Sequence, residues 1–295
     1  MIASMPLPTP VELTRLMVVG QRQPLTRTPA DADLAFEEVA FTASDGVPLE
    51  GWFVPALTAG PGPAVVFVHG WLWNRVGNVG GLVPFHDRDV DFLPAVRALH
   101  DAGVHVLLFD LANHGRSGRR LPMTFGAWEA RDVIGATSWA RMRPEVDPLR
   151  VGVLGISMGG NAALEAGPYN QPLPAMLLIQ PNRAGTFISR FAKDHLGKHG
   201  ASILHPTDWA YAAVRAPRPG RADPRAAARR LTGTVCRYVQ GTGDPWGTMS
   251  DVEDMVAVTP KALPLVRYPS TGRYEGYQYL IEHADDVAAF FAEHL

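Results

Sequence analysis

The sequence predicts an α/β fold, in which a mostly parallel sheet is covered by helices on both faces. Its 295 residues are 46% hydrophobic and 19% charged, a balance typical of a globular protein with a large core. Short apolar runs alternate with helix-length segments, and such runs are typical of parallel strands that are buried on both sides. The runs span residues 64–68, 104–109, 151–154, 175–179, 235–239 and 263–268.

The other segments follow in chain order. A short helix is predicted at 11–18, and an antiparallel hairpin is predicted where residues 38–44 and 49–55 flank an Asp-Gly turn. Glycine or proline follows most of the later helical segments and marks their ends. These helices are predicted at residues 92–102, 128–143, 158–166 and 251–258, and a last helix closes the chain.

The chain is predicted to form one core with an insertion. Residues 1–37 are expected to be a leader helix and linker, and the core is expected to comprise residues 38–183 and 233–295. Residues 184–232 are more numerous than one crossover helix needs. We expect this insertion to form a small helical cap over the carboxyl ends of the strands.

A serine lies between a predicted strand and a predicted helix, in the run Gly-Ile-Ser-Met-Gly at residues 155–159. The flanking glycines let strand and helix approach closely, and the tight turn presents the oxygen of Ser157 at the helix N-terminus. Backbone N–H groups and the helix dipole favour negative charge there. This context predicts that Ser157 is a nucleophile. The alternative is a serine kept in a turn that performs no chemistry.

Three further motifs accompany the serine. A Phe-x-x-x-Asp-Gly hairpin begins at Phe41, a His-Gly pair at His69 ends a strand, and Asp110 begins an Asp-x-x-x-His-Gly-x-Ser run. With these motifs the chain resembles the α/β-hydrolase superfamily, in particular its soluble esterase-like and peptidase-like members. The resemblance covers residues 38–180 closely and 234–295 more loosely, and it implies a sheet of roughly eight strands.

The resemblance also implies roles for individual residues. Ser157 attacks a carbonyl carbon, and the backbone N–H groups of Trp71 and Met158 form the oxyanion hole. Asp244 lies in a Gly-x-x-Asp turn after a late strand, where the superfamily has the acid that orients a histidine and stabilises its protonated form. His69 is expected to brace the loop that carries Trp71 rather than to take part in the chemistry.

The histidine itself is missing from its expected position. The turn after the last strand should carry it, and the residue found there is Arg273. Because arginine stays protonated in proteins, it cannot accept the serine proton, and a serine without a general base is a weak nucleophile. We therefore expect Arg273 to occupy the third catalytic position, with hydrolysis weakened or altered.

Three explanations of the arginine remain open. First, another histidine serves as the base: His86 and His205 could reach the site from loops. His283 lies in a helix that apolar spacing predicts to be unbroken over 277–291, about 15 Å along its axis from Arg273. Second, the chemistry has changed, and Arg273 binds an anion or polarises a carbonyl in a cyclase-like or lyase-like reaction or in ligand binding. Third, the arginine is an engineered replacement.

The sequence thus predicts a hydrolase-type enzyme that acts on a small molecule with an ester, thioester or amide carbonyl. No cofactor or metal ion is expected, since there is no Gly-x-Gly-x-x-Gly run and no ligand-spaced cluster of His, Asp or Glu. A net charge of −2 without long runs of one sign predicts no nucleic-acid or membrane partner, and a homodimer is left open. The single cysteine, Cys236, and the lack of a signal-peptide pattern favour a cytoplasmic protein.

Overall fold

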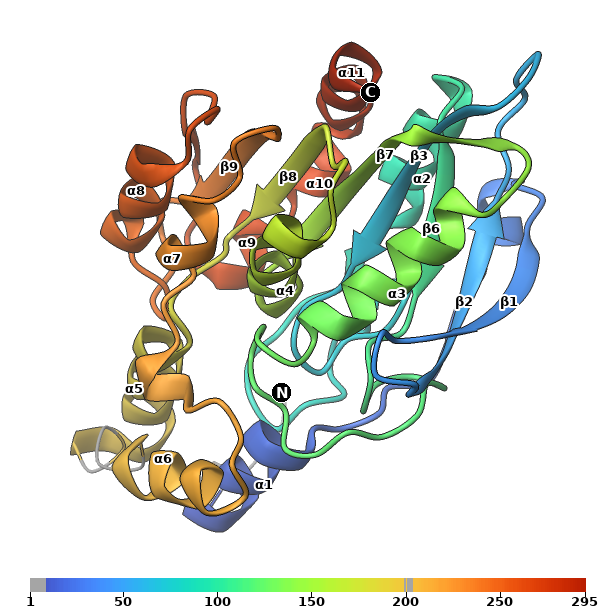
Figure 1. Ribbon diagram of the computed structural model, residues 1–295. Coiled ribbons are helices and arrows are strands. Elements are labelled where there is room, and N and C mark those ends of the chain that lie inside the picture. Colours follow the sequence, from blue (N-terminus) through green and yellow to red (C-terminus); the bar gives the residue numbers. More distant parts are fainter. Residues whose placement is uncertain (1–8, 199, 201–203) are drawn as a thin grey trace.

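The computed structural model describes residues 9–198, 200 and 204–295, of which 204–206 by their backbone only. Its centre is an eight-stranded sheet in the order β1-β2-β6-β3-β7-β8-β9-β10 (Figure 1). From β6 to β10 neighbouring strands are parallel, whereas β1 and β2 form the predicted antiparallel hairpin and β2 also runs antiparallel to β6. The predicted α/β fold is therefore confirmed. The strands are β1 Glu37–Thr42, β2 Pro48–Val54, β3 Gly62–Val68, β6 His105–Phe109, β7 Val146–Ile156, β8 Ala175–Ile179, β9 Val235–Gly241 and β10 Val266–Tyr268, with a separate pair β4 Gly77–Asn78 and β5 Val90–Asp91.

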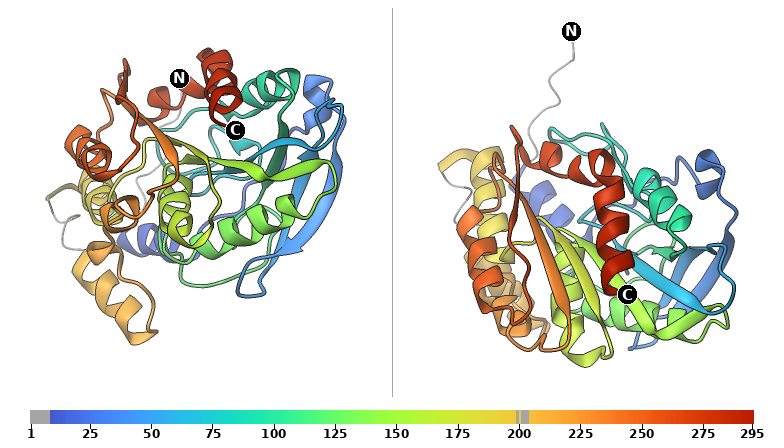
Figure 2. Two further views of the ribbon diagram at one scale, coloured as in Figure 1. Left: turned by 45° about the horizontal axis from the view of Figure 1, so that its top comes forward. Right: turned by 90° about the horizontal axis from the view of Figure 1, so that it is seen from above.

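Helices cover both faces of the sheet (Figure 2). The helices α3 and α4 lie on one face, α2 and α11 lie together on the other, and α7 packs against α4 and α8. Among the described residues, no helix combines the length and the apolar character that crossing a lipid bilayer requires. The helices are α1 Pro10–Val19, α2 Leu93–Asp101, α3 Ala130–Arg141, α4 Met158–Ala166, α5 Ala184–Leu196, α6 Leu204–Ala213, α7 Arg225–Ala228, α8 Met249–Val258, α9 Arg273–Gly276, α10 Tyr279–Glu282 and α11 Ala284–His294.

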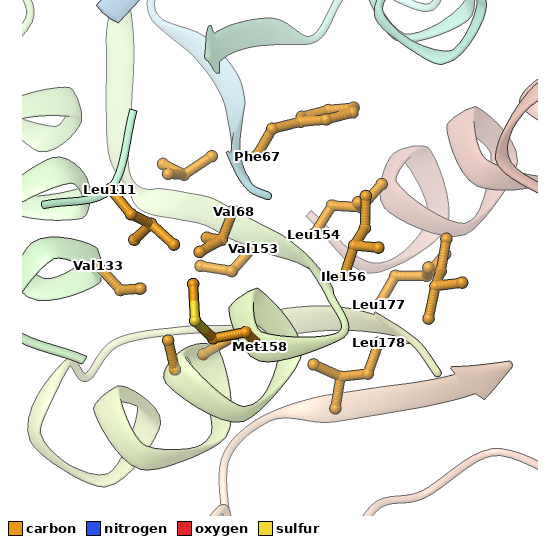
Figure 3. Close-up of a cluster of buried hydrophobic side chains, with 14 of the residues drawn as sticks. Phe67, Val68, Leu111, Val133, Val153, Leu154, Ile156, Met158, Leu177 and Leu178 are labelled. Carbon is orange, nitrogen blue, oxygen red and sulfur yellow. The ribbon is translucent and has the colours of Figure 1, made fainter. Parts of the chain in front are cut away.

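The central strands are buried on both faces, which explains their unbroken apolar runs. Every residue of β3, β6 and β8 is buried. In Figure 3, Val68 of β3, Val153 of β7 and Val133 of α3 belong to one cluster of buried side chains, into which the side chain of Met158 points. Because Met158 is the first residue of α4, this burial holds the start of that helix against the sheet.

Three helices lie together at the carboxyl ends of the parallel strands: α5 and α6 of the inserted segment, and α1 of the N-terminal segment (Figure 1). The side chains of Leu13 and Met17 in α1 are fully buried. The indole Nε1 of Trp71 donates to the carbonyl of Leu16 at 3.2 Å. The N-terminal helix, expected as a leader, thus packs onto the loop that follows β3. Together α1, α5 and α6 form a roof over the carboxyl ends of the strands (Figure 1).

The end of the chain differs from the prediction of one unbroken helix over 277–291, which was wrong. The helices α9, α10 and α11 take its place, and His283 between α10 and α11 has a non-helical backbone with φ −122° and ψ 35°. Leu280 and Val287 are nevertheless both fully buried. Apolar spacing continued across the break because the helices on either side pack onto the same core.

Candidate active site

Ser157 lies in a sharp turn between β7 and α4. Its backbone has φ 54° and ψ −118°, and a positive φ is uncommon for a residue with a side chain. A Cβ at Gly159 would lie 2.1 Å from the carbonyl oxygen of Val68, so this close approach requires glycine. The N–H of Ser157 donates to the carbonyl of Ile179 at 2.9 Å and ties the turn to β8. The strand–turn–helix context expected around Ser157 is present.

The loop after β3 comes close to this turn. A Cβ built at Gly70 would lie 3.5 Å from the Cβ of Ser157. The backbone of Gly70, the residue before Trp71, therefore lies next to the serine. Within the described part of the chain, the backbone N–H groups of Trp71 and Met158 donate to no protein acceptor. Two free N–H groups beside a serine hydroxyl are the arrangement that an oxyanion hole would require.

Two buried histidines hold the loop that carries Trp71. The N–H of Leu111 donates to His69 Nε2 at 3.0 Å, and the N–H of Leu72, the residue after Trp71, donates to His114 Nε2 at 3.3 Å. Burial lowers the pKa of both imidazoles, and that of His69 falls to about 3. Neutral imidazoles that accept backbone hydrogen bonds fit the interpretation of His69 as a structural residue.

The three residues expected at the site meet at one point. Arg273 is the first residue of α9; its Nη2 donates to Ser157 Oγ at 2.9 Å, and its Nη1 donates to Asp244 Oδ2. The other carboxylate oxygen of Asp244 accepts the N–H groups of Trp246 and Gly247, both at 3.0 Å. The guanidinium thus bridges the acid and the serine, where the resemblance places an imidazole.

Arg273 and Asp244 form a buried ion pair, with side chains that are 3% and 1% exposed. Burial disfavours the charged form of Arg273, but the carboxylate of Asp244, together with Tyr277 and Tyr274, outweighs burial and raises the pKa of Arg273 above its ordinary value. The guanidinium is therefore always a donor towards Ser157, and it cannot take the proton of the hydroxyl.

Four residues that the sequence analysis missed complete the surroundings of Arg273. The carbonyl of Gln180 accepts from Nη2 at 3.2 Å, and Gln180 Nε2 donates to the carbonyl of Arg273 at 2.8 Å. With its amide turned so that both of its polar atoms are satisfied, Asn182 accepts from Nη2 at 2.9 Å and from Nη1 at 3.2 Å. The guanidinium carbon also lies 5.3 Å from the ring centre of Phe187 and 5.4 Å from that of Tyr277, within the range of cation–π attraction.

A pocket opens beside Ser157 and Arg273, and the rest of its lining is aromatic. Its cavity volume is about 20 Å³, which is room for roughly one water molecule. Burial raises the pKa of Tyr277 to about 12, although the charge of Arg273 and hydrogen bonding with Ser157 and Arg273 oppose this shift. Tyr277 therefore presents a neutral hydroxyl beside the serine. The aromatic lining consists of Trp71, Trp73, Phe85, Phe187, Trp246, Tyr274 and Tyr277.

Neither His283 nor His86 lies at the pocket beside Ser157. His283 Nδ1 lies 3.2 Å from Asp286 Oδ2, and its ring stacks on Tyr279, outside the pocket lining. His86 is exposed and does not line the pocket, and the side chain of His205 lies outside the described residues. In the same part of the chain, no group of three or more His, Cys, Asp or Glu side chains is arranged to hold a metal ion.

Comparison with known protein sequences identifies relatives over part of this chain. An uncharacterized protein of Mycobacterium tuberculosis is 35% identical over 146 residues, which is 50% of this chain and 45% of that protein. Thiohydrolase aneE of Aspergillus aculeatus is 27% identical over 168 residues, 57% of this chain and 48% of that protein. The chain thus spans about half the length of these two relatives.

Solved structures share the fold over nearly the whole chain. An esterase of Pyrococcus furiosus superimposes with a TM-score of 0.70 at 20% identity, covering 94% of this chain and 97% of that one. The alpha/beta hydrolase GrgF of a Penicillium species gives a TM-score of 0.64 at 18% identity, covering 88% and 99%. The model of the alpha/beta hydrolase family matches residues 65–290, a range that includes Ser157, Asp244 and Arg273. The chain therefore belongs to the alpha/beta hydrolase family.

Proposed function

We propose that the chain is a hydrolase-type enzyme that acts through Ser157 on an ester, thioester or amide carbonyl of a small molecule, with chemistry altered by Arg273. The observation that supports this most is the hydrogen bond of 2.9 Å from Arg273 Nη2 to Ser157 Oγ. A hydrogen bond from a cation stabilises the alkoxide of the serine more than the neutral hydroxyl. Arg273 thus activates Ser157 by its charge instead of by accepting a proton.

In this mechanism the serine proton goes to hydroxide or water. The alkoxide of Ser157 attacks the carbonyl carbon, and the developing oxyanion is stabilised by the N–H groups of Trp71 and Met158. Collapse of the tetrahedral species expels the leaving group, which takes a proton from water or from the hydroxyl of Tyr277, since the high pKa of Tyr277 keeps it protonated. Water then hydrolyses the acyl-enzyme. Without a general base, both steps are slow near neutral pH.

The pH dependence of hydrolysis tests this mechanism. The rate for p-nitrophenyl acetate is expected to rise about tenfold per pH unit between about pH 7 and pH 10, because hydroxide concentration sets the fraction of alkoxide. An enzyme with a histidine base would instead level off above the pKa of that histidine. The control is Ser157→Ala, whose rate should equal that of buffer. A plateau near neutral pH would contradict the mechanism, and equal rates in both proteins would exclude Ser157 as the nucleophile.

A second candidate function is binding of a carbonyl ligand without turnover. It is favoured by one observation: the amino groups of Arg273 all have protein acceptors, so that none remains to assist a reaction at Ser157 beyond the contact already made. If this candidate holds, no hydrolysis above buffer appears at any pH of the same series. The pH series therefore separates the two functions.

We also infer that arginine is native to this position and no engineered replacement. An imidazole has two ring nitrogens, which Asp244 and Ser157 would occupy. The carbonyl of Gln180 and the amide oxygen of Asn182 are further acceptors, and they match N–H groups that a guanidinium has and an imidazole lacks. Four acceptors arranged around one guanidinium support a site that is built for arginine.

A further inference from the structure

One ring of the aromatic pocket differs from its neighbours. Phe85 lies in the loop between β4 and β5 and is only partly buried, whereas Trp71 and Trp246 are each 7% exposed. Its ring lies parallel to that of Trp71, with an interplanar angle of 10° and 6.0 Å between centroids. Phe191 at 5.0 Å and Trp246 at 6.1 Å meet it edge to face. The surroundings of Phe85 thus form a slot for one flat ring.

The slot offers no charge for a ligand to pair with. His195, whose ring meets that of Phe85 edge to face at 5.5 Å, has its Nδ1 2.8 Å from the carbonyl oxygen of Phe191. Among the described residues Arg273 is the one charged side chain of the lining, and its Nη1 already donates to Asp244 within the buried pair. Its amino groups donate to Ser157, Gln180 and Asn182 as well. A charged ligand group would be buried here without a partner, which is costly. A neutral aromatic ring would gain burial and edge-to-face contacts instead.

The pocket is also too small for a ring while Phe85 is in place. Its cavity volume is about 20 Å³, whereas a cavity of about 150 Å³ binds benzene. Phe85 is partly exposed, and its loop neighbours Leu82 and His86 are exposed, so its ring has room to turn towards solvent. Its departure would leave the face of Trp71 and the edges of Phe191 and Trp246 free, next to Ser157.

We propose that this pocket takes the aromatic acyl group of an uncharged ester or thioester, and that Phe85 occupies its place until the ligand displaces it. The ring of the ligand lies against Trp71, and its carbonyl lies at Ser157. The position of the carbonyl rests on the proposed function, but the ring slot does not. Binding of a ketone, which has no leaving group to lose, therefore tests the slot apart from turnover.

Calorimetric titration of the intact protein with acetophenone is the test. Acetophenone is expected to bind about tenfold more tightly than cyclohexyl methyl ketone, which has a saturated ring. Benzoate, which carries a charge, is expected to bind the most weakly of the three. Phe85→Ala is expected to lower the Kd for acetophenone by about tenfold, because the ligand no longer has to displace a ring from Trp71.

Phe36→Ala is the matched control, since Phe36 is also a partly buried ring that meets a tryptophan edge to face (Trp52, 5.4 Å) and lies outside the pocket. It should leave the Kd unchanged. Unchanged or weaker binding of acetophenone to Phe85→Ala would overturn the displacement, and equally tight binding of benzoate would overturn the uncharged class. Ketone binding without hydrolysis of aromatic esters would support this inference and contradict the proposed function. Hydrolysis without a preference for aromatic ligands would support the proposed function and contradict this inference.

Discussion

Replacing Arg273 with methionine is expected to lower the free energy of unfolding by about 3–5 kcal/mol. The side chain of Asp244 is 1% exposed, and the substitution leaves its carboxylate buried without a cation. The N–H groups of Trp246 and Gly247 still donate to it, but they do not cancel its charge. Methionine is long and unbranched, so it fills much of the space and the effect of a cavity is small. Urea-induced unfolding at neutral pH measures the change.

The double variant Arg273→Met with Asp244→Asn separates charge from packing. Removing both charges is expected to recover most of the lost stability, because a neutral amide costs less to bury than an unpaired carboxylate. If the free energy of unfolding of Arg273→Met lies within about 0.5 kcal/mol of the native value, as for a typical surface substitution, the ion pair does not stabilise this site.

Arg273→His is expected to raise the hydrolysis of p-nitrophenyl acetate at neutral pH by about a hundred- to ten-thousandfold, the range typical of general acid–base catalysis. An imidazole at this position can accept the proton of Ser157 while Asp244 orients it and stabilises its protonated form. The variant should also acquire a plateau above the pKa of the new histidine, so that its pH profile changes in shape as well as height.

Arg273→Gln controls for the loss of the arginine. Glutamine can donate a hydrogen bond but cannot take a proton at neutral pH, so its rate should stay at or below that of the native protein. Equal rates for the histidine and glutamine variants would mean that position 273 is not where a base acts. Adding Ser157→Ala to Arg273→His should return the rate to that of buffer.

The features that could be predicted are those encoded by residues close together in the sequence. The sharp turn at Ser157 depends on glycines within two residues of it, and the buried strands are visible in the sequence as continuous apolar runs. The break at His283 left no trace, because apolar spacing continues through it. Gln180 and Asn182 were missed because they reach Arg273 across more than ninety positions of the chain, a distance over which no periodicity acts. Their place directly after β8, at the carboxyl end of a central strand, was the one usable signal.

The N-terminal helix shows the same limit. The helix is short and the sequence gives no partner for its apolar residues, yet Leu13 and Met17 are fully buried and the carbonyl of Leu16 accepts the hydrogen bond of Trp71. The roof over the site is therefore assembled from two segments that are far apart in the chain. Contacts of this kind follow from the tertiary fold and cannot be derived from local composition.

The central claim is that Ser157 is a nucleophile activated by the charge of Arg273 and not by a base. The rate at which a fluorophosphonate labels the native protein, followed by mass spectrometry over a range of pH, tests this claim most directly. The expected result is one label, on Ser157, that forms about tenfold faster per pH unit and is lost in Ser157→Ala. No label at any pH up to about 10, or a label that persists in Ser157→Ala, would contradict the claim.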